Sequence, residues 1–186
     1  MKTIGRLLII LGMSATMLTS CYLDIHFGDF DLKYEYETEW AAAYYYGYSP
    51  EEEAVKYRLE LILGRTDDEN NLTSFGSKAS LVLTAPEQDH IDLPGGTYGS
   101  RSNYNLSCGD DTDPVDPDTT EYSYVEMVVP GTGEMACYPV ESGTVRVEVR
   151  ADGSYEITAE LSAADCQLEY EYEGPMVTYD LSDLKF

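Results

Sequence analysis

The densest group of potential metal ligands lies in an acidic segment near the middle of the chain, where five aspartates fall within residues 109–118. Calcium takes roughly six to eight oxygen ligands, and loop aspartates can supply them. The candidate ligands are Asp111, Asp113, Asp116 and Asp118. However, the central Gly and terminal Glu of a calcium-binding loop are missing, and the prolines at 114 and 117 extend the chain. We therefore favour a solvated loop over 109–121 that is stabilised by salt screening, with no specific effect of calcium.

Aromatic residues form the second candidate site. The chain contains 17 Tyr and 1 Trp, and several of them cluster over residues 40–48, where a segment of turn composition over 47–53 begins. The cluster consists of Trp40, Tyr44, Tyr45, Tyr46 and Tyr48. Aromatic rings bury well against the apolar faces of sugars while their hydroxyls stay in water, so this group could bind a glycan. The alternative is that these tyrosines pack within a strand.

Two ladders of glutamates are the third candidate: Glu35, Glu37 and Glu39, and Glu169, Glu171 and Glu173. Carboxylates two residues apart on a strand lie about 7 Å from each other, a spacing that glycoside hydrolysis can use. Nothing in the pattern separates their pKa values, so we interpret them as solvated faces. His26 and His90 have no neighbouring nucleophile, and no phosphate-binding or dinucleotide-binding motif occurs. We expect no catalysis and no cofactor.

The N-terminus has the three regions of an export signal. Lys2 and Arg6 precede an apolar run over 7–13, and the sequence Leu-Thr-Ser-Cys ends at Cys21. This ending resembles the lipobox of bacterial lipoproteins, in which cleavage precedes a cysteine that carries a lipid. The resemblance implies a signal peptide over 1–20 and a lipidated N-terminus with a tether or first strand over 21–29. It also implies a cell-envelope location, with the outer membrane expected and the face it occupies left open.

Three further cysteines follow, at Cys108, Cys137 and Cys166. An exported protein meets an oxidising compartment, where an odd number of cysteines allows at most one internal pair. We favour a disulfide between Cys108 and Cys137, and the absence of any disulfide is the open alternative. The spacing does not match a zinc site.

Charge and composition limit the possible partners. With 35 acidic and 11 basic residues, the formal charge is −24, which disfavours binding to nucleic acid. A hydrophobic content of 43% is too high for a disordered acidic segment. The expected product is one folded domain over residues 30–186.

The elements that must position these groups are strands. Apolar and polar residues alternate over 31–40, 55–63, 145–149, 155–161 and 166–173, and this period of two is typical of half-buried strands. Asp152-Gly153 stands between two of these runs and predicts a hairpin with a tight primed turn. The last three runs, together with a final strand over 177–181, predict a four-stranded meander. Helix is expected for no more than a turn or two, near 50–57 and 161–165. We predict an all-β domain, an antiparallel meander that closes into a barrel or a two-sheet sandwich.

Four motifs resemble segments of small uncharacterised lipoproteins of gut Bacteroidetes with lipocalin-like or sandwich β folds. They are LPGGTYG at 93–99, SGTVRVEV at 142–149, DGSYEITAEL at 152–161 and EYEYEGPM at 169–176. This resemblance implies an envelope location and carries no catalytic residues. Two functions remain open. The first is a lipid-anchored binding or accessory module for a glycan, a small apolar ligand or a protein. The second is a structural envelope protein that acts by assembly or self-association.

Overall fold

The protein is built of strands. The computed structural model describes residues 21–27, 30–36, 38–66, 72–99, 103–110, 121–128, 134–164 and 166–183. The strands are β1 (Cys21–Phe27), β2 (Phe30–Tyr36), β3 (Thr38–Ser49), β4 (Ala54–Thr66), β5 (Leu72–Ala85), β6 (Gly96–Tyr98), β7 (Asn105–Leu106), β8 (Tyr124–Val128), β9 (Met135–Pro139), β10 (Ser142–Val149), β11 (Tyr155–Ala163), β12 (Cys166–Gly174) and β13 (Val177–Asp180). The predicted all-β class is confirmed, and none of the described residues is helical. In this part of the chain, accordingly, no helix is suited to crossing a membrane.

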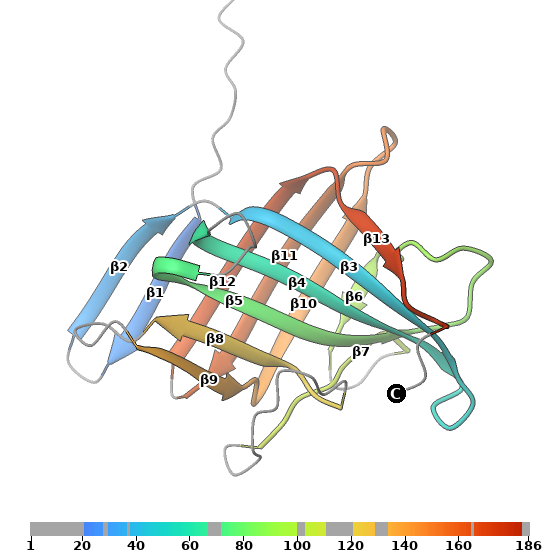
Figure 1. Ribbon diagram of the computed structural model, residues 1–186, viewed down its shortest axis with the longest axis horizontal. Helices are drawn as coiled ribbons and strands as arrows, with labels where there is room; N and C mark the ends of the chain where they lie inside the picture. Colours follow the sequence, from blue (N-terminus) through green and yellow to red (C-terminus); the bar gives the residue numbers. More distant parts are fainter. Residues whose placement is uncertain are drawn as a thin grey trace, which may run out of the picture.

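Two large sheets face each other (Figure 1). One contains seven strands. Six of them are ordered β13-β3-β4-β5-β8-β9, and the seventh, β7, pairs with Leu83 and Thr84 near the end of β5. The other contains four strands, ordered β12-β11-β10-β6. A two-stranded hairpin of β1 and β2 lies next to β12. Among the described residues no ladder joins the two large sheets, so their arrangement resembles a sandwich.

The core lies between the inner faces of these sheets. On β4, Tyr57, Leu59, Leu61 and Leu63 are fully buried and belong to one hydrophobic cluster with residues of the other sheet. On β11, the burial alternates strictly along the strand. Successive side chains of a strand point to opposite faces, so the period of two in the sequence becomes one buried face on each sheet.

The end of the chain departs from the predicted meander. Strands β10, β11 and β12 pair in sequence as expected, but β13 leaves that sheet and pairs in parallel with β3 of the other. Pro175 explains the exit, because proline has no N–H to continue the ladder beyond Gly174. The chain therefore crosses between the sheets within two residues, and it places Tyr179 beside Tyr44.

The hairpin between β10 and β11 forms as predicted, but with a longer loop. The N–H of Gly153 donates to the carbonyl of Arg150 at 3.0 Å, and the N–H of Arg150 donates to the carbonyl of Ser154 at 2.8 Å. Only Gly153 adopts a left-handed conformation, with φ of 83°. Asp152 instead accepts hydrogen bonds from the hydroxyl and N–H of Ser154, which lower the pKa of its carboxyl. The predicted primed turn, which needs two positive φ values, is thus absent.

One end of the core is closed by residues 86–95, the connection between the two sheets. Leu93 is 1% exposed and joins the core cluster. The hydroxyls of Tyr57, Tyr155 and Tyr98 donate to the carbonyls of three consecutive residues, Asp92, Leu93 and Pro94. Burial raises the pKa of all three phenols, that of Tyr57 to about 12. Each tyrosine comes from a different strand, so this connection is tied to both sheets.

A buried hydrogen bond also joins the sheets through the core. The hydroxyl of Tyr170 on β12 donates to Oγ of Ser77 on β5 at 2.7 Å, and both residues are fully buried. We predict that Tyr170→Phe lowers the free energy of unfolding by about 1–2 kcal/mol, because the Ser77 hydroxyl then lacks a partner in a dry site. Adding Ser77→Ala should recover part of this loss. Urea denaturation measures both effects, with the exposed Tyr179→Phe as the control. A double variant less stable than Tyr170→Phe alone would contradict the prediction.

Candidate functional site

The outer face of the seven-stranded sheet carries a polar cluster. Along β4 the side chains of Lys56, Arg58, Glu60 and Ile62 alternate with the core residues, so they face away from the core. The ladders align Glu60 with Ala42 of β3 on one side. On the other side they align it with Ser80 of β5, which itself lies opposite Tyr124 of β8. Four strands therefore contribute to one row across this face.

Glu60 is the centre of the cluster. It is only 9% exposed, although it lies on the outer face. Its Oε2 accepts a hydrogen bond from the Tyr44 hydroxyl at 3.2 Å, and its Oε1 lies 3.3 Å from Nζ of Lys78. A carboxylate this well covered is stable only when paired and hydrogen-bonded. Both of its oxygens are thus held in place by neighbouring strands.

A pair of aromatic rings lies next to Glu60. The rings of Tyr44 and Tyr179 stack with centroids 5.4 Å apart and an interplanar angle of 21°. Tyr179 is 47% exposed, so one side of this pair faces solvent. Burial, followed by the charge of Glu60, raises the pKa of the Tyr44 phenol well above its usual value. The phenol therefore stays protonated and donates to Glu60 at neutral pH. We refer to Tyr44, Glu60, Lys78 and Tyr179 as the Glu60 cluster.

The aromatic residues singled out from the sequence are divided between the two faces of β3. Trp40 lies opposite Ile62, and Tyr44 opposite Arg58, so both are on the outer face. Tyr45 packs against the core, with its ring 5.4 Å from that of Tyr57. Tyr46 is the extra residue of a bulge between Tyr45 and Gly47, and Tyr48 follows it; the φ of 90° at Gly47 suits glycine.

The bulge determines where the last two rings of this group lie. Burial raises the pKa of the Tyr46 phenol, and Arg58 partly opposes the rise, which places Tyr46 near the charged groups of the outer face. Tyr48 lies opposite Val55, a core residue, and is 46% exposed at the strand end. The structure therefore brings Tyr44 and Tyr46 to one face and separates Tyr45 and Tyr48 from them. Sugar binding by this group stays a prediction.

A polar hollow of about 650 Å³ lies at the start of β4, beside the turn at 50–53. Its lining residues are Glu52, Glu53, Ala54, Thr84, Pro86, Asn103, Asn105 and Ser107. Thr84 pairs with both Lys56 and Asn105 across the sheet, so the floor of the hollow continues the outer face beyond Arg58. The turn at 50–53 and the segment at 103–107 form its walls. We refer to this feature as the polar hollow.

Sequence reasoning missed most of this site. Lys78 lies outside the alternating runs predicted from the sequence, and Tyr179 was assigned to a meander with the strands of the other sheet. The charged residue at 60 was visible only as one polar position in an alternating run. The alternation carries the signal that Glu60 faces outward, but it contains no information about which strands flank it.

The predicted disulfide between Cys108 and Cys137 is not formed, since Cys108, Cys137 and Cys166 are free thiols. Cys108 packs against the core, and its Sγ contacts the carbonyl of Leu106 at 3.7 Å. Cys137, on β9, lies opposite Glu126 of β8 and precedes Tyr138, which packs against the core. The two thiols therefore face opposite sides of the sheet. Burial raises the pKa of both, which disfavours the reactive thiolate.

The candidate calcium ligands at 111, 113, 116 and 118 lie outside the described residues, as do residues 1–20 of the predicted signal. Within the described part of the chain, no three His, Cys, Asp or Glu residues are grouped as metal ligands. Cys21 begins β1, and its position in the ladder is opposite Tyr36. Acylation of Cys21 stays a prediction.

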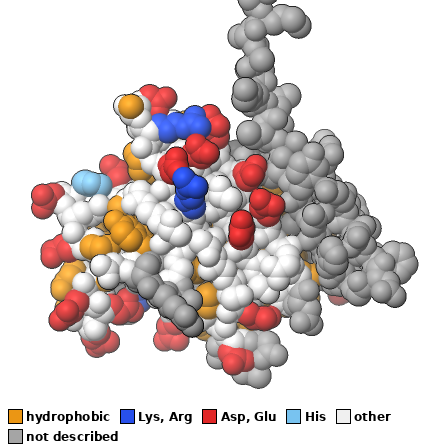
Figure 2. Space-filling view, turned by 180° about the vertical axis from the view of Figure 1, so that it is seen from behind, with side chains coloured by type: hydrophobic (Ala, Val, Ile, Leu, Met, Phe, Trp, Pro, Cys, Tyr) orange, Lys and Arg blue, Asp and Glu red, His pale blue; other side chains and the backbone are white. Residues whose placement is uncertain are grey.

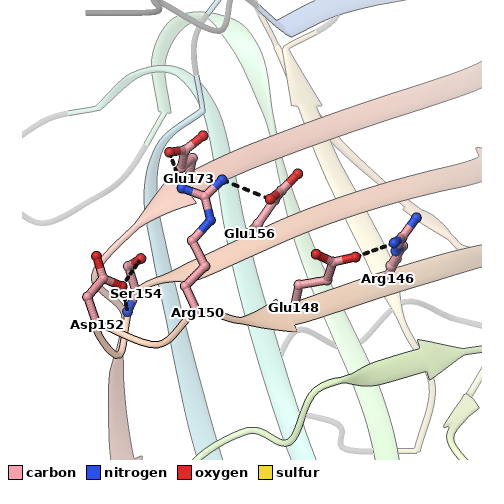
Figure 3. A network of polar contacts seen from close by, with 7 residues as sticks. All are labelled: Arg146, Glu148, Arg150, Asp152, Ser154, Glu156 and Glu173. Carbon is pink, nitrogen blue, oxygen red and sulfur yellow. Dashed lines mark hydrogen bonds and ion pairs between the residues drawn. The ribbon is translucent and has the colours of Figure 1, made fainter.

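The other large sheet presents an acidic outer face. Figure 2 views the molecule from behind and shows acidic side chains gathered around a few basic ones. The register places Glu148, Glu156 and Glu173 abreast on three strands. Arg150 pairs with both Glu156 and Glu173, and Arg146 pairs with Glu148 (Figure 3). The exposed glutamates at 169, 171 and 173 confirm that this ladder is a solvated face. Such exposed ion pairs contribute little to stability individually.

Comparison with protein-family models, with curated proteins and with solved structures finds no match to this chain.

Removing the amine that pairs with Glu60 tests the geometry of the cluster. We predict that Lys78→Met lowers the free energy of unfolding by about 1–3 kcal/mol, because it leaves a covered carboxylate without its cation. The matched control is Lys56→Met, which removes an exposed pair to Glu52 at 3.0 Å and should cost less than about 1 kcal/mol. Chemical denaturation at neutral pH compares the two variants. Equal losses in both would show that Glu60 is not a desolvated group.

Proposed function

We propose that this chain is a lipid-anchored binding module of a bacterial cell envelope, and that it holds a glycan on the outer face of its seven-stranded sheet. The observation that carries the proposal is the stacked pair of Tyr44 and Tyr179, which is open to solvent and lies next to a fixed carboxylate. A sugar ring buries its apolar side on such rings, and its hydroxyls hydrogen-bond to charged groups at the edge.

The fixed position of the polar groups supports a binding role. Tyr44 and Lys78 hold Glu60 from two different strands, and the strands themselves are hydrogen-bonded. Groups that are already ordered lose little conformational entropy when a ligand binds. Because Arg58 and Lys78 lie beside Glu60 and Glu126, this face also carries a balanced charge within a chain of −24.

The position of the anchor supports an orientation. Cys21 lies opposite Tyr36, two residues before β3 begins at Thr38. Strand β3 then runs for 12 residues toward the turn at 50–53, which is roughly 35 Å at the usual rise of a strand. Figure 1 shows β1 and β2 at the opposite end of the long strands from this turn. A lipid on Cys21 would therefore leave the polar hollow pointing away from the bilayer.

The alternative, a structural protein that assembles through its sheet edges, is less well supported. The edge strands β13, β9 and β6 contain 4, 5 and 3 residues. The longer edge strand β12 has β1 alongside it. Short or covered edges offer few free N–H and carbonyl groups for pairing with another chain. Asp180, at the end of β13, adds a charge to the most exposed edge.

Lipid anchoring is tested by Cys21→Ser. We predict that the wild-type protein partitions with membranes and has the mass of an acylated chain that begins at Cys21, because the leader resembles a lipobox. The variant should remain unprocessed or become soluble, since an acyl anchor cannot form without the sulfur. Cys137→Ser, at a half-buried position far from the leader in the sequence, is the control. Membrane fractionation and intact mass spectrometry measure the result, and unchanged partitioning and mass in Cys21→Ser would exclude the anchor.

Glycan binding is tested with an array of neutral and charged glycans and the full-length protein in detergent. We predict that Tyr44→Ala combined with Tyr179→Ala weakens binding to any bound glycan by at least about tenfold, because the solvent-facing side of the ring pair and the ring that supports it are both lost. Met135→Ala, which truncates an exposed side chain on β9, should bind like the wild type. Tyr44→Phe separates the ring from its hydrogen bond to Glu60. If no glycan binds while sedimentation shows concentration-dependent assembly, the structural alternative is favoured.

A further inference from the structure

The polar hollow differs chemically from the Glu60 cluster. Six of its lining side chains are polar: Glu52, Glu53, Thr84, Asn103, Asn105 and Ser107. Among the described residues that line it, none is basic. The amine of Lys56, which lies opposite Thr84 in the ladder, is 3.0 Å from Glu52 in an ion pair. A ligand in the hollow therefore meets no free cation from the residues that line it.

The hydrogen-bonding capacity of these groups is unequal. Ionised carboxylates only accept hydrogen bonds, whereas amides and hydroxyls both donate and accept. The lining thus contains more acceptors than donors, and the ligand must supply donors to satisfy it. Sugar hydroxyls are donors, and an ammonium group supplies three N–H donors together with a positive charge. An ionised carboxylate supplies no donor, and the charge of Glu53 would repel it.

The walls of the hollow are fixed before any ligand binds. Thr84 is 7% exposed and pairs with Asn105 across the sheet. Ser107 donates its N–H to the carbonyl of Val82 at 2.9 Å, and it accepts the N–H of Ser123 at 2.8 Å. On the opposite wall, Glu53 has a left-handed backbone, with φ of 51°. Non-glycine residues adopt this conformation at a cost, and such residues are concentrated at functional sites.

The volume of the hollow and the negative charge of the chain both favour a small ligand that carries hydrogen-bond donors or a positive charge. A volume of about 650 Å³ falls within the range of roughly 300–1,000 Å³ that is typical of small-molecule sites. The formal charge of −24 attracts cations and repels anions from a distance. This long-range term acts everywhere on the surface, so a specific effect of the hollow must be measured against it.

We infer that the polar hollow selects its saccharide by charge: it favours sugars that carry a free amine, accepts neutral sugars and excludes acidic ones. This inference rests on the proposed function and adds a second contact region, beyond the Glu60 cluster, whose residues set the ligand class. Glu53 provides the charge that distinguishes an amine from an amide on the sugar. Asn105 provides hydrogen bonds that any saccharide in the hollow uses.

The test uses the full-length protein in detergent with three oligosaccharides of equal length. These are chitosan oligomers with free amines, the same oligomers N-acetylated, and oligogalacturonate. Isothermal titration calorimetry at a mildly acidic pH, at which the chitosan amines are protonated, should give the tightest binding for the amine form, weaker binding for the acetylated form and none for the acidic form. The preference for the amine should shrink at high salt, since screening weakens charge attraction. Binding of the acidic oligomer at an affinity equal to the others would overturn the inference.

Two variants with the same change in net charge distinguish a local effect of the hollow from the long-range effect of the chain's charge. Glu53→Gln should weaken binding of the amine oligomer by roughly three- to tenfold and leave the acetylated form unchanged. Glu160→Gln, at an exposed position on the other sheet, should change neither. Asn105→Ala should weaken both forms, and thermal melts confirm that each variant folds. Equal effects of Glu53→Gln and Glu160→Gln would overturn the inference by assigning the preference to long-range charge.

The two proposals fail in different ways. If acetylated oligomers bind through Tyr44 and Tyr179 but free amines add nothing, the inference about the hollow is wrong and the proposed function stands. If none of the three oligomers binds, and the glycan array is also empty, the proposed function itself is wrong.

Discussion

The inner face of β4 lies at the centre of the molecule, and its burial sets the position of nearly every other group. Tyr57, Leu59, Leu61 and Leu63 are fully buried between the two sheets. Shifting this strand by one residue would turn Arg58 and Glu60 into the core, which is far more costly than any contact they make outside. The register of β4 with β3 and β5 is therefore fixed by hydrophobic burial. The polar outer face inherits that register.

The outer face shows how a sheet can hold charged groups without exposing them fully. Glu60 is covered by its neighbours, yet it lies on the side of the sheet away from the core. Its cation comes from β5, and its hydroxyl partner comes from β3. On the outer face of the other sheet, by contrast, Arg150 and its two glutamates stay in solvent, where ion pairs are weak. The two outer faces therefore differ in order as well as in charge.

The connections between the sheets shape the functional region. The residues at 86–95 cross from one sheet to the other under three tyrosine hydroxyls, and Leu93 fills the core below them. The exit after Gly174 returns the chain to the first sheet and brings Tyr179 to Tyr44. Ordered crossings of this kind allow residues more than a hundred positions apart to form one surface. They also place the polar hollow at the far end of β3 from Cys21.

The sequence by itself determined the class of the fold and the facing of most side chains. Period-two alternation in β4, β10, β11 and β12 predicts which residues are buried, because the geometry of a strand is local. Asp152-Gly153 likewise marked a real hairpin, although the loop proved longer than a two-residue turn. The leader and Cys21 predict a lipid-anchored envelope location, which the described strands do not test.

Only the tertiary structure decided which strands are neighbours, and hence which side chains meet. Nothing local in Thr178 or Tyr179 distinguishes a fourth strand of a meander from a parallel partner of β3, since both need the same alternation. The facing of Cys108 and Cys137 away from each other likewise depends on the sheet between them. Pairing depends on the burial of whole sheet faces, which is a property of distant segments acting together. For this reason the aromatic cluster could be read from the sequence as a group, while Glu60, Lys78 and Tyr179 became one site only in the fold.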